Sequence, residues 1–291
     1  MLQPIINDDP NSLYPSTPAN APPFQILAGS SHVFLRQSID WLQLVTSNVL
    51  PNELDYFCFD VSSLSNIPIQ NQKEYMKQFE NNSPPFLNVK EQSSFFARWC
   101  CLATNRPLKL QFRGVSHAHV GQVINFPGGV APGVAPLILA EGEKKCAWAC
   151  LCFDRPEIKI SMKTANNSYE IGTVRYNFSF FDFMFSILDA KREKIYEIDG
   201  SCCQCGLMCP RCVCDPCLKA DFLVKDIKKS RNFYIKRKNN HRWKSCFART
   251  DDFFIDLPND VSLEDRVLLV CAGVMIDMMI YRLKEQQEGN N

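Results

Sequence analysis

The sequence predicts a mainly β protein, in which antiparallel strands form a closed barrel or a sandwich around an apolar helix near the C-terminus. Many short segments either alternate apolar and polar residues or are rich in aromatic residues, as strands are. Near the end of the chain, fifteen nearly continuous apolar residues, Val267 to Tyr281, are interrupted only by Asp277. A helix that is apolar on all sides has to be surrounded, and the strands can enclose it.

The composition indicates one large domain of nearly neutral charge. With 291 residues, of which 46% are hydrophobic, the chain can bury a sizeable core. A formal net charge of +1 excludes a globally basic nucleic-acid binder, and no motif points directly to a nucleic-acid partner. The first residues lack a secretory signal, so we expect an intracellular setting with reduced cysteines.

The N-terminal region is predicted to contain an extended arm followed by a helix. Residues 1–28 hold six prolines, which favours a mobile arm, either inert or bound by proline-binding modules. The domain is expected at 29–285, with a disordered tail at 286–291. An amphipathic helix is expected after Ser30, with apolar residues at helical spacing. These residues are Val33, Leu35, Ile39, Leu42 and Val45.

The strands are expected to follow one another with no helix between them. Their predicted ranges are 56–62, 95–100, 108–114, 119–126, 156–162, 169–178, 183–188, 194–199, 220–227 and 232–238. Turn-like runs at 164–168 and 189–194 suit antiparallel hairpins. Residues 64–90 and 127–136 are predicted to be surface loops.

The apolar run near the C-terminus has two interpretations. A helix that crosses a bilayer needs about 20 apolar residues, and this run is shorter and carries Asp277. Its length therefore favours a core helix enclosed by protein over a marginal membrane segment.

Several sequence blocks together resemble the phospholipid scramblase family. In chain order they are VFLRQSIDWLQLVT, NELDYF, RWCC with RPLKLQF, SILDAKREKIYEIDG, DDFFIDLPNDV and VLLVCAGVMIDMMIYRL. They extend from about Ser30 to Leu283. The resemblance implies a tubby-like fold, with about twelve strands closed around the hydrophobic helix. It also implies calcium-triggered, ATP-independent movement of phospholipids between leaflets.

The first cysteine group consists of Cys146, Cys150 and Cys152. It lies where scramblases carry a palmitoylated cysteine run, so the resemblance implies an S-acyl anchor. One acyl chain binds a bilayer only marginally, whereas two chains, or one chain with basic residues such as Lys144 and Lys145, hold a protein there. The alternative is that these cysteines are small core residues of a strand.

The second cysteine group extends from Cys202 to Cys217 and contains three pairs with CxxC spacing. Cys202, Cys205, Cys209 and Cys212 are the candidate zinc ligands, because tetrathiolate sites use such pairs. The pairs lie closer together than in a zinc ribbon. S-acylation and unmodified surface thiols are therefore equal alternatives.

The resemblance also implies a calcium-binding loop with EF-hand-like spacing at residues 249–260. Its candidate ligands are Asp251, Asp252, Asp256 and Asp260. Arg249 replaces the first carboxylate and Phe254 replaces the turn glycine, which weakens the expected site. The alternative is an acidic turn that leads into the C-terminal helix.

Basic residues are concentrated in residues 225–244, where nine lysines and arginines are interleaved with aromatic residues. The candidate patch comprises Lys228, Lys229, Arg231, Lys236, Arg237, Lys238, Arg242 and Lys244. Such a patch could bind anionic lipid headgroups, at about 1 kcal/mol per charge. Recognition by the nuclear import machinery and a merely solvated strand are the alternatives.

The leading hypothesis is a phospholipid scramblase at the cytoplasmic face of the plasma membrane. Either its acyl chains or the C-terminal segment would attach it, phospholipids and an anionic membrane surface would be its partners, and an oligomer could form the lipid path. No nucleophile–base pair, phosphate-binding loop or dinucleotide motif indicates an enzyme. The alternative is a membrane-tethered module that binds phosphoinositides or proteins, can enter the nucleus and transports nothing.

Overall fold

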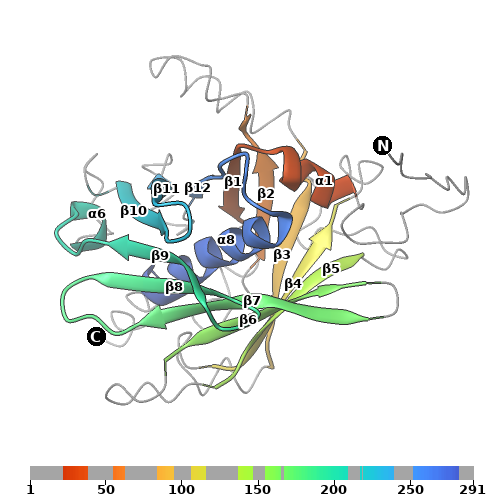
Figure 1. The fold of residues 1–291 in the computed structure, drawn as a ribbon, viewed down its shortest axis with the longest axis horizontal. Helices are drawn as coiled ribbons and strands as arrows, with labels where there is room; N and C mark the ends of the chain where they lie inside the picture. Colours follow the sequence, from red (N-terminus) through yellow and green to blue (C-terminus); the bar gives the residue numbers. More distant parts are fainter. Residues whose placement is uncertain are drawn as a thin grey trace, which may run out of the picture.

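The computed structural model is a closed barrel of twelve antiparallel strands around a central helix (Figure 1). It describes residues 22–38, 55–62, 84–94, 106–115, 137–146, 155–164, 167–208, 217, 219–238 and 252–281. The strands are β1 (His32–Gln37), β2 (Asp55–Asp60), β3 (Leu87–Gln92), β4 (Leu108–Gly114), β5 (Ile138–Lys144), β6 (Glu157–Lys163), β7 (Ser168–Asn177), β8 (Phe183–Asp189), β9 (Lys194–Gly200), β10 (Lys219–Asp226), β11 (Arg231–Lys238) and β12 (Asp252–Asp256). The helices are α1 (Pro22–Gly29), α6 (Cys205–Met208), α8 (Leu263–Ile276) and the π-helical turn η4 (Asp277–Tyr281). The predicted fold class is confirmed.

The barrel closes between its first and last strands. Each strand pairs with its neighbours in chain order, and β1 pairs with β12 in the register Arg36↔Asp252. Arg36 Nε lies 3.4 Å from Asp252 Oδ1 across this seam. Each of the described strands therefore has a partner on both sides, and the ring has no open edge.

The strand ends gather at two rims. The α1 rim carries α1 and the start of α8. The cysteine rim carries Cys146 after β5 and Cys202 after β9, because the registers align the end of β5 with the start of β6 and the end of β9 with the start of β8. In Figure 1, α1 and α6 accordingly lie at opposite ends of the barrel.

Helix α8 fills the barrel and forms the centre of the core. Its first residues suit a helix start: Ser262 Oγ accepts a hydrogen bond from the Asp265 backbone N–H at 3.1 Å, and Glu264 and Asp265 lie near the positive end of the helix dipole. From Arg266 onward every residue of α8 and η4 is buried. The prediction of an enclosed core helix is confirmed. Of the helices that the structure describes, none has both the length and the apolar character required to cross a bilayer.

Two glycines allow the helix to approach the barrel wall. A Cβ at Gly172 in β7 would lie 2.3 Å from the Leu188 carbonyl oxygen and 3.0 Å from Leu268 Cδ1. A Cβ at Gly273 in α8 would lie 3.1 Å from Ile255 Cδ1. The core is therefore packed too tightly for a side chain at Gly172.

The charged residue that interrupts the apolar run is paired inside the barrel. Asp277 is 1% exposed and accepts a hydrogen bond of 2.5 Å from the hydroxyl of Tyr56, which is fully buried. The buried guanidinium of Arg237 lies 4.1 Å from the centre of the Tyr281 ring. Hydrogen bonding and ring contact thus compensate the cost of removing these polar groups from water.

A second buried charge joins α1 to α8. Arg266 is 1% exposed, and its guanidinium donates to the carbonyl oxygens of Val261, Pro258, Leu27 and Ser30. Burial lowers its pKa from the ordinary arginine value. The carbonyl-rich C-terminal end of α1 suits a cation, so Arg266 holds α1 over one rim of the barrel.

The N-terminal predictions require two corrections. The arm predicted for residues 1–28 is wrong from Pro22 onward, because α1 places the fully buried Phe24 and Leu27 in the core. The helix predicted after Ser30 is wrong over β1. There, pairing with β2 and β12 outweighs the helical spacing, and the remainder of that prediction lies outside the described residues.

Besides β1, three strands were not predicted. β3 lies partly in the range 64–90 that was expected to be a loop, β5 was not identified, and β12 lies in the segment assigned to calcium. Their polar residues concealed the alternation, since Glu91 and Lys144 are buried in the barrel. The strands predicted at 95–100 and 119–126 and the loop at 127–136 lie outside the described residues.

We predict that Gly172→Val lowers the free energy of unfolding by about 3 kcal/mol, because the new side chain has to displace the β8 backbone or Leu268. Urea denaturation followed by far-ultraviolet circular dichroism measures this change. Gly29→Ala is the control, since a Cβ there meets nothing within 4 Å, and it should stay within about 0.5 kcal/mol of wild type. Equal losses for the two variants would contradict the packing argument.

We predict that Arg266→Met lowers the free energy of unfolding by about 2–4 kcal/mol, because buried carbonyl oxygens lose their donor. The same denaturation measurement applies. Lys225→Met is the matched control: this lysine is 42% exposed and pairs with Glu197 and Asp199, so its loss should cost less than about 1 kcal/mol. An Arg266→Met variant as stable as wild type would show that α1 does not depend on this residue.

Candidate functional site

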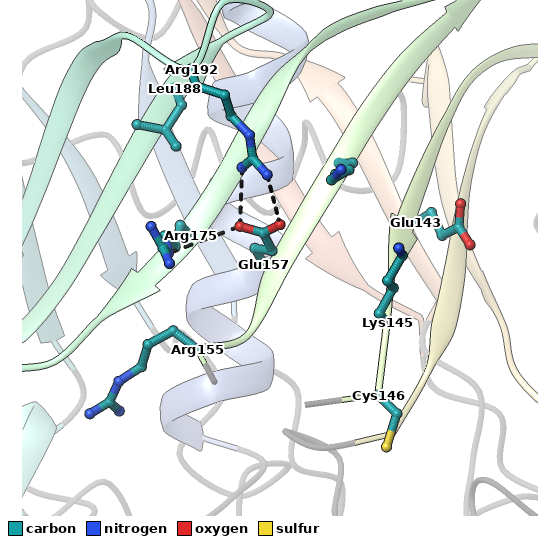
Figure 2. Close-up of a pocket in the computed structure, with 9 residues that line it drawn as sticks. Glu143, Lys145, Cys146, Arg155, Glu157, Arg175, Leu188 and Arg192 are labelled. Carbon is teal, nitrogen blue, oxygen red and sulfur yellow. Dashed lines mark hydrogen bonds and ion pairs between the residues drawn. The ribbon is translucent and has the colours of Figure 1, made fainter. Parts of the chain in front are cut away.

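A charged pocket of about 530 Å³ lies on the outer face of the barrel (Figure 2). It is lined by Glu143, Lys145, Cys146, Arg155, Glu157, Lys159, Arg175, Leu188 and Arg192. Cys146 and Arg155 lie at the cysteine rim, and Arg192 lies at the α1 rim, so the pocket follows the barrel wall between the two. Its lining has five basic and two acidic side chains, which makes it positive.

One of the two pocket carboxylates, Glu157, is already paired with arginines. The Arg192 guanidinium donates two hydrogen bonds to Glu157, at 3.1 and 3.2 Å, and Arg175 Nε lies 3.9 Å from the same carboxylate. Burial alone would raise the pKa of Glu157, but these arginines and Lys159 outweigh it and lower that pKa below its ordinary value. Glu157 therefore stays ionised and holds the two arginines in place.

The turn between β8 and β9 brings Arg192 to this carboxylate. Arg192 has a φ of 68°, in the left-handed region that a non-glycine residue seldom adopts. The Asp189 side chain accepts hydrogen bonds from the backbone N–H groups of Lys191 and Glu193, each at 2.9 Å. These hydrogen bonds offset the cost of the left-handed conformation at Arg192, so the turn holds the guanidinium beside the pocket.

Arg155 contacts an aromatic ring at the cysteine-rim end of the pocket. Its guanidinium carbon lies 4.6 Å from the centre of the Phe178 ring. Its Nε is buried and has no hydrogen-bond partner among the described residues. A guanidinium stacked on a ring keeps its positive charge, so Arg155 can pair with an anionic group such as a phosphate through the part of the guanidinium that is not buried.

The first cysteine group is described only at its start. Cys146 is exposed at the edge of the pocket, next to Lys145, as an acylation site has to be. Lys144, by contrast, is buried and donates to the Arg106 carbonyl oxygen at 2.7 Å, so it cannot contact a membrane. Cys150 and Cys152 lie outside the described residues.

The short helix α6 lies within the segment that contains the second cysteine group. Cys205 is exposed and Cys202 is half-buried, whereas Cys209 and Cys212 lie outside the described residues. Within the described part of the chain, no three His, Cys, Asp or Glu side chains come together as metal ligands. Zinc binding by this group stays a prediction.

The acidic segment before α8 is mostly a strand. Asp252 and Asp256 lie at the two ends of β12, about 13 Å apart, whereas two ligands of one calcium ion lie within about 5 Å. Phe254, at the expected turn glycine, packs on Phe34 with ring centres 4.7 Å apart. The described residues therefore do not form the predicted EF-hand-like loop. Asp251 lies outside them.

The candidate aspartates are occupied by basic side chains. Asp252 pairs with Arg36, and Asp256 lies 3.6 Å from Lys236. Hydrogen bonds from Lys229 and Arg231 hold the pKa of Asp260 well below its usual range. Calcium binding would have to displace these cations.

The candidate basic patch is divided by the fold. Lys228, Lys229 and Arg231 lie at the α1 rim, where Asp189, Asp226 and Asp260 pair with them. Lys236, Arg237 and Lys238 lie further along β11 toward the cysteine rim, and Arg237 points inward. Arg242 and Lys244 lie outside the described residues. The described residues of this segment thus do not form one continuous basic surface.

Sequence analysis named Lys145 beside the first cysteine group but did not identify the other four basic residues of the pocket. All five come from three separate segments: the ends of β5, the outer face of β6 and β7, and the β8–β9 turn. The strands β6 and β7 were predicted, but their register was not. The feature of the sequence that could have indicated the pocket was the pair of basic residues, Lys159 and Arg175, at outward-facing positions of adjacent strands.

Comparison with known proteins supports the assignment suggested by the fold. A family model described as Scramblase matches residues 138–283, which is half of the chain and includes the pocket. Phospholipid scramblase 2 of Bos taurus is 26% identical over 103 residues, covering 34% of this chain and 31% of that protein. The match therefore spans about a third of the relative's length. No solved structure matches. With its twelve-stranded barrel, its enclosed helix and this family match, the chain belongs to the scramblase family.

Proposed function

We propose that this protein is a phospholipid scramblase, which moves phospholipids in both directions between the leaflets of a membrane without ATP. The observation that carries the proposal is the family match over residues 138–283. These residues include the positive pocket and Cys146, so the matched region has groups that could contact lipid headgroups. The cytoplasmic face of the plasma membrane is the proposed place of action.

S-acylation of Cys146, Cys150 and Cys152 is the proposed means of attachment. The exposure of Cys146 supports it, as does the proximity of Lys145 and Arg155. An acyl chain and a cluster of cations together hold a protein on an anionic bilayer, whereas either alone binds reversibly. Calcium is proposed as the trigger only because the sequence resembles the scramblase family.

A second candidate function is a headgroup-binding module that does not transport lipid. The positive pocket supports it, because five basic side chains line it against two acidic ones and could bind a phosphate. Such a module would bind phosphoinositides at the membrane, and nuclear entry would be a further property.

We predict that the purified protein reconstituted in vesicles makes inner-leaflet fluorescent phospholipid accessible to dithionite without ATP. Protein-free vesicles are the control, and parallel samples contain calcium or a chelator. Accessibility beyond the outer-leaflet fraction supports scrambling, and the difference between the parallel samples measures the role of calcium. Tight binding to phosphoinositide vesicles with no added accessibility would refute scrambling and support the binding module.

We predict that changing Cys146, Cys150 and Cys152 together to serine abolishes labelling by a palmitate analogue and moves the protein from membranes into the soluble fraction. Without acyl chains only the cations remain, and cations alone bind a bilayer reversibly. Cys203→Ser is the matched control, since Cys203 is an exposed cysteine outside this group. Unchanged labelling of the triple variant would place the acyl chains elsewhere.

A further inference from the structure

The most exposed large apolar side chains that the structure describes lie at one rim. Phe180 is 83% exposed, Phe181 is 79% exposed and Met208 is 66% exposed. The two phenylalanines lie in the connection between β7 and β8, and Met208 ends α6. All three therefore lie at the cysteine rim. A cluster of large apolar side chains in water marks a surface that contacts something apolar.

The β7–β8 connection is held in shape by its own contacts. The Asp182 carboxylate accepts a hydrogen bond from the Cys202 backbone N–H at 3.1 Å, and the Asp182 N–H donates to Ser179 Oγ at 3.1 Å. Phe178 meets Phe180 edge to face, with ring centres 4.7 Å apart. The connection is thus joined to the start of the second cysteine group and presents Phe180 and Phe181 without first having to be ordered.

Positive charge lies directly beside this apolar tip. Arg155 stacks on Phe178 and also lines the positive pocket, together with Lys145 and Lys159. The α1 rim differs, because Asp189, Asp226 and Asp260 pair with its cations. The cysteine rim therefore combines apolar side chains with cations that are available to an anionic partner.

We propose that the cysteine rim is the surface that docks on an anionic lipid bilayer. Phe180, Phe181 and Met208 enter the boundary between headgroups and acyl chains, and Lys145 and Arg155, the pocket cations at this rim, bind the headgroup phosphates. A bilayer fits this surface better than a second copy of the chain, because it offers apolar acyl chains and anionic phosphates side by side, which match the exposed phenylalanines and the adjacent Lys145 and Arg155. The inference rests on the proposed membrane setting and adds the orientation: the barrel stands on this rim and the α1 rim faces the cytoplasm.

The test is sedimentation with vesicles, using full-length protein that carries no acyl chains. We expect wild type to bind phosphatidylcholine vesicles containing phosphatidylserine more tightly than phosphatidylcholine vesicles alone. Phe180→Ser with Phe181→Ser should weaken this binding about tenfold or more, since two large side chains no longer leave water. The thermal unfolding temperature should change little, because both side chains are exposed and Phe180 loses only its edge contact with Phe178.

Ile227→Ser is the matched control, because Ile227 is 47% exposed and lies beside Lys228 and Lys229 at the α1 rim. It should change binding less than about twofold. In a separate variant, Phe181→Trp should add tryptophan fluorescence that lipids with brominated acyl chains quench, whereas Ile227→Trp should add none that they quench.

Equal vesicle binding by wild type and the double serine variant would overturn the proposal, and so would a larger loss with Ile227→Ser. A double variant that binds vesicles normally but changes from dimer to monomer in light scattering would assign the rim to self-association instead. The proposed function fails separately. If binding depends on Phe180 and Phe181 but no lipid moves between leaflets, the docking surface is supported and scrambling is refuted. If lipid moves but the double serine variant binds like wild type, scrambling is supported and the docking surface is refuted.

Discussion

The enclosure of α8 is the constraint on which the rest of the structure depends. A helix whose surface is apolar on every side is stable only when protein surrounds it, and the ring of strands has to close to do so. Closure in turn requires each polar group inside to find a partner. Asp277 has Tyr56, and Arg266 has the backbone carbonyls of α1 and the preceding loop. The side chains inside the barrel therefore stabilise the fold, and the side chains available to bind a ligand are those of the outer wall and the rims.

The simple order of the strands determines which outer side chains become neighbours. Because each strand lies beside the next one in the chain, residues 155–192 contribute most of one continuous wall, and their charges sum to the positive pocket. The same order separates the ends of β11 by the length of a strand, which divides a run of basic residues that looked continuous in the sequence. A binding surface of this barrel is therefore formed by side chains of adjacent strands and not by consecutive residues of one strand.

The sequence predicted the architecture better than the candidate site, for physical reasons. The apolar run from Val267 and the strands with regular alternation depend on burial, which leaves a clear periodic pattern. β3 and β5 lack that pattern, because Glu91 and Lys144 are buried through specific partners: Arg106 forms an ion pair of 2.6 Å with Glu91 and offers its carbonyl oxygen to Lys144. The surroundings of Arg155 and Phe178 depend on register and turn geometry, which local composition does not encode. Phe254 appeared to be a defect in a calcium loop, and the structure explains it as a strand residue packed on Phe34.

The seam between β1 and β12 also determines when the molecule can be completed during synthesis. Arg36 and Asp252, which face each other across it, are 216 positions apart, and α8 follows both. A nascent chain on the ribosome therefore exposes the inner faces of its strands until β12 and α8 have emerged. Pairing over such a separation is slow, so the unfinished sheet is open to aggregation for longer than a sheet built from local pairs.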